Sequence, residues 1–198
     1  MVCVQIARLS LTPWRKLNTV IQIDLNPKCV RSKKLTNRSL PDGMTPLHPI
    51  ALITTWFGAG LLPKAPGTWG SLAALPFAWM IVQTFGMLGL ALATVLVFGL
   101  GVWASDIFVK RFGGEDPQAI VIDEVAGQWL VLVLVPADLT YYAAGFVLFR
   151  VVDIFKPWPA NWADREVKGG LGVMLDDVLA APYAMAVLYG ITLMIAEV

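Results

Sequence analysis

The residues best suited to chemistry in this sequence are carboxylates that stand in apolar surroundings. Asp123 and Glu124 are adjacent in the stretch IVIDEVAGQWLVLVLVPADL, and Asp176 and Asp177 form a second doublet in GGLGVMLDDVLA. Asp153 is a single acid in LFRVVDIF. A buried carboxylate is costly unless it is paired or binds a metal. A doublet is hard to explain as a helix cap alone, so these five acids are predicted to form a site.

Basic residues accompany the acids. Arg150 lies about one helical turn before Asp153, and the polar segments carry further cations at Lys64, Lys110, Arg111, Lys156, Arg165 and Lys168. Carboxylate oxygens are the ligands that Mg²⁺ prefers, while Arg and Lys bind phosphate oxygens. The combination of acidic and basic side chains therefore predicts a divalent metal together with a phosphorylated ligand.

Other phosphoryl-transfer chemistries lack the residues that they need. His48 is the only histidine and precedes every acidic cluster, which argues against the phosphohistidine route of the type-2 phosphatidate phosphatases. Neither Cys3 nor Cys29 has an arginine six residues on, and neither a D-x-D-x-T/V stretch nor a GxxxxGK[ST] loop occurs. Hydrolysis by carboxylates and Mg²⁺ remains, with the metal positioning or activating a water. An aspartate nucleophile that forms an acyl phosphate is equally compatible.

The chain that carries these acids is strongly apolar. Of its 198 residues, 57% are hydrophobic and only 15% are charged, and the mean hydropathy is +0.68. Soluble domains average roughly 45–50% apolar residues. Lipid admits only helices or closed barrels, and the apolar runs lack the period-two alternation of barrel strands. The sequence therefore predicts an all-α fold, a compact multi-pass bundle of membrane helices with polar loops.

Breaker residues divide the apolar sequence into segments. The breaker-rich LLPKAPGTWGS is predicted to be a shaped loop, with a helix starting at Ser71 as a possible cap. Gly86 is expected to interrupt the helical run that follows. The predicted apolar segments are 47–62, 71–85, 87–109, 120–135, 139–155 and 178–196, with polar loops at 112–119 and 156–172.

The turn at Ala137 allows the acids to be placed in space. Asp123 lies fourteen residues before this turn and Asp153 sixteen after it, so both are about 21 to 24 Å from it at the rise of a helix. An antiparallel hairpin then brings them to the same face. The same up-and-down count brings the last helix, opened by Asp176 and Asp177, to that face as well. This face carries charges of both signs and more Lys and Arg than helix capping requires, which predicts that it is cytoplasmic.

Several polar and aromatic residues have simpler explanations. Acids at helix ends favour the helix dipole whatever the function, and loop charges are usually solvated. Trp158 and Trp162 are predicted to be interfacial anchors rather than substrate contacts. The acids assigned to capping or solvation are Asp106, Glu115, Asp138 and Glu166.

The first 45 residues differ from the rest in charge. They hold eight Lys and Arg against two acids, whereas residues 46–198 hold seven against twelve. A basic segment beside apolar spans is typical of a cytoplasmic N-terminus and does not indicate nucleic-acid binding. The segment lacks the apolar core and cleavage site of a signal peptide, and Cys3 and Cys29 lack metal-ligand spacing. We expect a poorly ordered extension over 1–45, followed by a membrane domain over 46–198.

Four motifs together resemble the phosphatidylglycerophosphatase A family. They occur in order, at fitting spacings, within about residues 47–196: LPKAPGTWGS (62–71), DPQAIVIDEVAGQW (116–129), FRVVDIFKPWPANWADR (149–165) and GGLGVMLDDVLA (169–180). The resemblance implies a Mg²⁺-dependent phosphatase of the bacterial inner membrane with its active face cytoplasmic. Its lipid substrate would be phosphatidylglycerophosphate, which loses its terminal phosphate to give phosphatidylglycerol and inorganic phosphate.

The resemblance also assigns roles by motif. Asp116 and Asp164 lie inside matching motifs, as a further ligand or the general base. In PGTWGS, the hydroxyls of Thr68 and Ser71 and the backbone N–H groups either bind the substrate phosphate at a helix N-terminus or only cap the loop. The implied metal or catalytic carboxylates are Asp123, Glu124, Asp153, Asp176 and Asp177, and the implied phosphate ligands are Arg150, Lys156 and Arg165.

Three other classes of membrane protein fit less well. A CDP-alcohol phosphotransferase also uses carboxylates and Mg²⁺, but its D-x2-D-G-x2-A-R-x8-G-x3-D-x3-D pattern is absent. An aspartyl intramembrane protease needs a GxGD motif, and GLGV at 170–173 lacks its acid. An ion-coupled transporter would place acids near the middle of the bilayer, whereas these cluster at one end.

Overall fold

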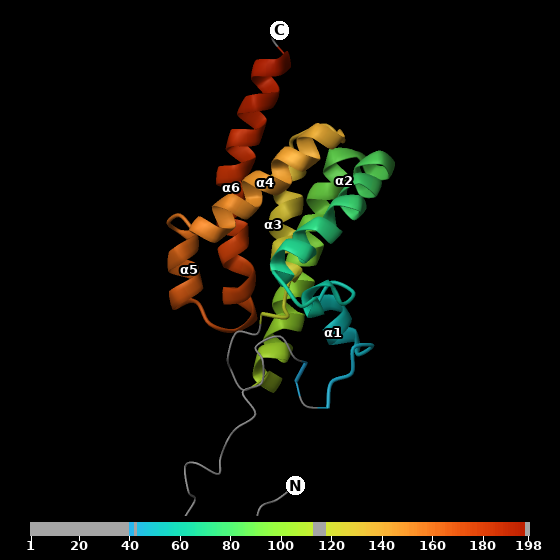
Figure 1. Ribbon diagram of the computed structural model, residues 1–198, viewed down its shortest axis with the longest axis vertical. Helices are drawn as coiled ribbons and strands as arrows, with labels where there is room; N and C mark the ends of the chain where they lie inside the picture. The colour runs from blue at the N-terminus through green and yellow to red at the C-terminus, as the bar shows by residue number, and fades with distance from the viewer. Residues whose placement is uncertain (1–39, 42, 113–117, 197–198) are drawn as a thin grey trace, which may run out of the picture. The chain divides into compact units, whose positions relative to one another are not determined.

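The computed structural model describes residues 40–41, 43–112 and 118–196. Within these ranges every regular element is a helix and no strand occurs, which confirms the predicted all-α class. Most of the expected extension over 1–45 lies outside the described residues. The helices are α1 (Pro49–Thr54), the 3-10 helix η1 (Ala59–Leu61), α2 (Pro66–Phe112), α3 (Ile122–Leu132), α4 (Leu139–Phe155), α5 (Ala160–Glu166) and α6 (Gly169–Ala196) (Figure 1).

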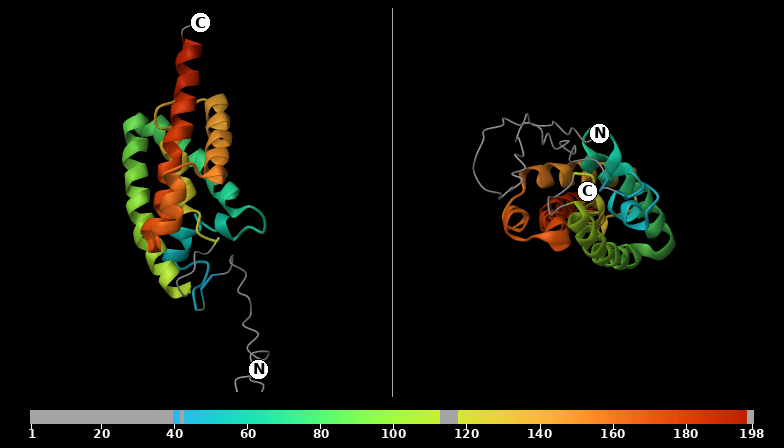
Figure 2. Two further views of the ribbon diagram at one scale, coloured as in Figure 1. Left: turned by 90° about the vertical axis from the view of Figure 1, so that its left-hand side faces the viewer. Right: turned by 90° about the horizontal axis from the view of Figure 1, so that it is seen from below.

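Helix α2 consists of two arms that meet at Gly86. The ribbon rises along the first arm, 66–85, and returns along the second, 87–112 (Figures 1 and 2). Gly86 adopts φ 68° and ψ −172°, a conformation that is essentially restricted to glycine, so the predicted break is confirmed. The predicted start at Ser71 was wrong because Pro66, whose ring favours the first helical position, already begins the helix.

Helices α3 and α4 form the predicted hairpin. Helix α3 ends three residues before the predicted limit of 135, since Pro136 cannot continue it and the chain tightens into i→i+3 bonds from Val133 and Val135. The Asp138 carboxylate accepts a hydrogen bond from the Thr140 N–H at 2.8 Å and so caps α4. Helix α4 then spans 139–155, as predicted.

The segment 156–172 was wrongly predicted to be a loop throughout. It contains α5 and the first turn of α6, which begins at Gly169. Asp176 and Asp177 therefore lie about two turns inside α6 rather than at its start. A Cβ on Gly170 would lie 2.1 Å from the Val102 carbonyl oxygen, so this glycine allows α6 to pack directly on the backbone of α2.

Helix α3 lies in the core and contacts α2, α4 and α6. Its side chains Val125, Ala126, Val131 and Leu132 are fully buried. The Trp129 indole N–H also donates to the Ala74 carbonyl of α2 at 2.9 Å. This packing fixes the position of the α3 N-terminus, where the acidic pair stands.

Two helical runs, 66–111 and 169–195, are long and apolar enough to cross a membrane. Most of each lies outside the protein interior, and large apolar side chains such as Phe85, Leu96 and Met194 are exposed. Surfaces of this kind are typical of contact with lipid.

Candidate functional site

A cavity of about 200 Å³ lies where the first turns of α2 and α3, the end of α4 and the early part of α6 meet. All five of the acids that the sequence singled out reach it. The lining residues are Pro66, Gly67, Gln118, Ile120, Asp123, Glu124, Asp153, Lys156, Asp176 and Asp177.

Three of these acids are arranged to bind a cation. One carboxylate oxygen each from Asp123, Glu124 and Asp177 lies within 4.8 Å of the other two. Each residue also has a buried oxygen without a hydrogen-bond partner, as does Asp176. Unpartnered buried carboxylate oxygens are expensive, and a divalent cation would satisfy several of them at once. The donor set therefore fits Mg²⁺.

The surroundings of Asp123 and Glu124 disfavour the ionised form of both carboxyl groups. Burial, followed by repulsion from Glu124, raises the pKa of Asp123 well above its usual range. Burial also raises the pKa of Glu124, and the negative charge of Asp153 adds to the effect while Arg150 opposes it. Without a cation, the pair is driven toward protonation.

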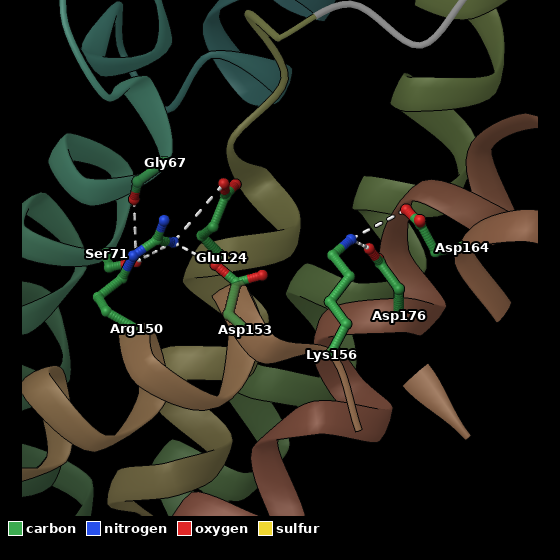
Figure 3. A network of polar contacts seen from close by, with 8 residues as sticks. All are labelled: Gly67, Ser71, Glu124, Arg150, Asp153, Lys156, Asp164 and Asp176. Carbon is green, nitrogen blue, oxygen red and sulfur yellow. Dashed lines mark hydrogen bonds and ion pairs between the residues drawn. The ribbon is translucent and has the colours of Figure 1, made fainter. Parts of the chain in front are cut away.

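Arg150 connects three elements beside the cavity. Its Nη1 lies 2.7 Å from Asp153 Oδ2 and 3.9 Å from Glu124 Oε1, and it donates to Ser71 Oγ at 3.5 Å (Figure 3). Arg150 does not line the cavity, so in this structure it lies behind the two carboxylates and orients them. Its Nε is buried without a partner.

Lys156 forms a second ionic group on the α6 side of the cavity. Its ammonium lies 2.9 Å from Asp164 Oδ1 and also pairs with Asp176 (Figure 3). Lys156 ends α4 in a left-handed conformation with φ 42°, which costs a non-glycine residue about 1 kcal/mol or more. Burial alone would lower the pKa of Lys156, but attraction to Asp176 outweighs it and raises that pKa, so the ammonium stays charged.

The remaining candidates lie around this centre. Thr68 lies in the first turn of α2 and Ser71 in its second, where the Ser71 hydroxyl donates to the Gly67 carbonyl at 2.9 Å rather than capping a loop. Asp164 lines a neighbouring cavity of about 220 Å³. Arg165 is exposed on α5 and makes no ion pair within the described part of the chain. Asp116 lies outside the described residues, and the roles of all of these remain predictions.

Gly67 and Gln128 were not singled out from the sequence. A Cβ on Gly67 would lie 2.0 Å from Glu124 Oε1, so only glycine lets α2 approach this carboxylate. The Gln128 amide, one turn after Glu124 on α3, is fully buried, and neither of its polar atoms has a partner. Gln128 could have been identified from the sequence, because it is an amide inside the apolar run DEVAGQWLVL. Gly67 could not, because the sequence PGTWGS does not show which side chain packs against its glycines.

The fold and the cavity define a class of protein, an all-helical and strongly apolar chain whose carboxylates and a lysine converge on one polar site. The chain belongs to the phosphatidylglycerophosphatase A family, whose sequence model matches residues 52–192. A phosphatidylglycerophosphatase A from Escherichia coli (strain K12) is 41% identical over 143 residues, covering 72% of this chain and 83% of that protein.

Two other relatives are similar at comparable levels. A phosphatidylglycerophosphatase A from Haemophilus influenzae is 39% identical over 146 residues, covering 73% of this chain and 90% of the relative. A protein from Bacteroides thetaiotaomicron named putative phosphatidylinositol-3-phosphatase is 40% identical over 146 residues, covering 67% of this chain and 87% of its own length. No solved structure matches the chain.

The raised pKa values of Asp123 and Glu124 predict how stability depends on pH. Because the metal-free native state binds more protons than the unfolded state, its stability should fall as the pH rises above the ordinary carboxyl pKa values of 3.8 and 4.5 toward these raised values. Thermal unfolding of detergent-purified protein in EDTA measures this. Added Mg²⁺ should raise the unfolding temperature more at the higher pH, and a Mg²⁺ effect independent of pH would contradict the assignment.

The contact between Gly67 and Glu124 predicts that Gly67→Ala weakens cation binding. The added methyl group must displace the Glu124 carboxylate, so the Mg²⁺ concentration needed for half of the thermal stabilisation should rise about tenfold, which corresponds to roughly 1.4 kcal/mol. Gly70→Ala is the matched control, because its Cβ meets the Val121 side chain at 2.7 Å. It should lower the unfolding temperature and keep the Mg²⁺ response. An unchanged response in Gly67→Ala would show that this contact does not position Glu124.

Proposed function

We propose that the protein is a Mg²⁺-dependent phosphatidylglycerophosphatase, which hydrolyses the terminal phosphate of phosphatidylglycerophosphate to phosphatidylglycerol and inorganic phosphate. The observation that carries the proposal is the cavity in which unpartnered carboxylate oxygens stand beside a charged lysine. Such a cavity suits a phosphate group and the cation that accompanies it. Membership of the family and relatives named for this activity support the choice of lipid.

The metal would be held by Asp123, Glu124 and Asp177, with Asp153 and Asp176 adjacent. When bound, Mg²⁺ neutralises charge on the phosphoryl group and positions or activates a water. A cation at this position also stabilises the ionised forms of Asp123 and Glu124. The donor set therefore favours a loaded site at neutral pH.

The chain's own residues would bind and orient the substrate. Lys156 is charged, reaches the cavity and can donate to phosphate oxygens on the side opposite Glu124. Arg150 holds Glu124 and Asp153 in place through its guanidinium. Asp164, paired with Lys156, fixes the direction of the ammonium. Both a water and an aspartate nucleophile remain compatible with this arrangement.

We further propose that the chain is a multi-pass protein of the bacterial inner membrane whose cavity opens to the cytoplasm. The cavity end carries Lys64, Lys110, Arg111 and Lys168, whereas the turns at Gly86 and Pro136 carry no Lys or Arg, a bias typical of the cytoplasmic side. Trp158, just before α5, and Trp162, on α5, are exposed, as expected of residues that anchor a protein at the membrane surface.

A phosphoinositide is the second candidate substrate. The relative named putative phosphatidylinositol-3-phosphatase favours it, because a phosphomonoester on an inositol ring presents the same charged group to the cavity. The acids of α3 and α4 lie at helix ends and those of α6 lie about two turns from its start, so all five meet away from mid-length. This position argues against the alternative of an ion-coupled transporter.

Phosphate release from phosphatidylglycerophosphate by the purified protein tests the proposed activity. We expect release only with Mg²⁺, and a loss of about a hundredfold or more in Asp123→Asn and Asp176→Asn. Asp123→Asn removes an anionic ligand of the cation, and Asp176→Asn removes the charge that pairs with Lys156. Asp138→Asn, at the opposite end of α4, should keep wild-type turnover. Activity that survives EDTA would contradict the requirement for a metal. Faster release from phosphatidylinositol 3-phosphate would identify a phosphoinositide as the preferred substrate.

Labelling of a single introduced cysteine tests the proposed orientation. Lys168 is exposed between α5 and α6, so Lys168→Cys, made with Cys3 and Cys29 replaced by serine, should accept a membrane-impermeant maleimide. In oriented membrane vesicles, we expect labelling only when the cytoplasmic side faces the reagent. Asp138→Cys is the control, because Asp138 precedes α4 at the end of the helix away from the cavity. It should be labelled only when the side opposite the cytoplasm faces the reagent. Labelling of Lys168→Cys from outside intact cells would invert the orientation.

A further inference from the structure

A second, wholly different pocket lies between the first arm of α2 and helix α4. Its volume is about 420 Å³, and it is formed by apolar side chains and aromatic rings. Trp79 and Tyr142 meet edge to face there, with ring centroids 5.2 Å apart. The lining residues are Leu72, Leu75, Pro76, Trp79, Leu139, Tyr142, Ala143, Phe146 and Val147.

This apolar groove is open to the surroundings of the protein. Leu72, Val147 and Leu139 belong to its lining and remain 43%, 57% and 76% exposed. Each is a large apolar side chain, and together they leave a continuous apolar surface without a partner in the described part of the chain. Such a surface calls for an apolar occupant.

The groove lies close to the polar site along both helices. Leu72 follows Ser71, whose hydroxyl lies 3.5 Å from Arg150 Nη1, and Phe146 and Val147 lie about one turn before Arg150 on α4. Along α4, Val147 is six residues, or about 9 Å, from Asp153 at the cavity. Along α2, Leu72 is five residues, or about 7.5 Å, from Gly67. A glycerol phosphate headgroup can bridge such a separation.

We propose that this groove binds an acyl chain of the lipid substrate while the headgroup phosphate enters the carboxylate cavity. The inference rests on the proposed function and adds to it a site that selects for chain length. An acyl chain gains little hydrophobic free energy on moving from lipid to protein, because both are apolar. The groove therefore acts by packing against the chain and by fixing the direction from which the headgroup approaches the cavity.

A second apolar hollow does not share these features. It has a volume of about 440 Å³ and is lined from Ile81 to Leu96, around the turn at Gly86. Gly86 is twenty residues, or about 30 Å, along the first arm from Pro66 at the cavity. A lipid in that hollow cannot place its headgroup in the cavity, which makes the hollow a matched control.

Filling the groove should impair long-chain substrates selectively. Ala143 is small and exposed in the groove wall, so Ala143→Phe should raise KM for dipalmitoyl phosphatidylglycerophosphate in mixed micelles about tenfold, with kcat nearly unchanged. Ala143→Leu should give a smaller rise. Both variants should hydrolyse the dibutyryl substrate as the wild type does, because its chains are too short to occupy the groove. Ala93→Phe, in the distant hollow, should behave as the wild type on both substrates.

Each other outcome overturns the proposal. Unchanged kinetics of Ala143→Phe on both substrates would mean that only bulk lipid fills the groove. An equal loss on both substrates, together with a changed mass on size-exclusion chromatography, would assign the groove to a second copy of the chain. If the wild type released phosphate from neither substrate, the proposed function would fail and the groove assignment with it.

Discussion

Repulsion among carboxylates that share a mostly buried cavity is the constraint on which the rest of the structure depends. Asp153, Asp176 and Asp177 are almost fully buried, and Asp123 and Glu124 stand beside them at the α3 N-terminus. Two cations offset part of this charge, Arg150 on the α2 side and Lys156 on the α6 side. Four carboxylate oxygens remain buried without partners. The negative charge of the cavity is therefore only partly compensated. A divalent cation, bound together with a phosphate group, would compensate the rest.

Close helix packing is what brings these charges together. Glu124 can lie against the first turn of α2 only because Gly67 has no Cβ, and α6 can carry its acids inward because Gly170 packs on the α2 backbone. Both contacts are made at the cavity end, while the Gly86 turn returns the second arm of α2 to that end. The same two elements that border the acids, the first arm of α2 and α4, continue away from them as an apolar groove. A polar cavity and an apolar groove joined in this way suit an amphipathic lipid.

Local patterns account for the part of the fold that was predictable. The turn around Pro136, the break at Gly86 and the bounds of α4 follow from proline and glycine chemistry and from an uninterrupted apolar run. The hairpin arithmetic also placed Asp153 and Asp123 at one site, because the two acids lie at similar distances from the turn that joins their helices. The errors fell where glycine and proline were taken as loop markers. In PGTWGS and KGGLG these residues lie at or inside helix starts, where they permit close approach instead.

The sequence by itself determined the helical class, the approximate helix ends and the set of five acids, since all of these depend on neighbours in the chain. Only the tertiary structure decided which atoms meet. It placed Arg150 behind Glu124 and Asp153 rather than in the cavity, directed Lys156 toward Asp176, and revealed Gly67 as the contact of Glu124. The physical reason is that these contacts, apart from the Arg150–Asp153 pair within α4, join residues 20 to 57 positions apart. The geometry of these contacts depends on how the helices pack against one another, at a precision of about an ångström. The local sequence pattern does not specify that packing.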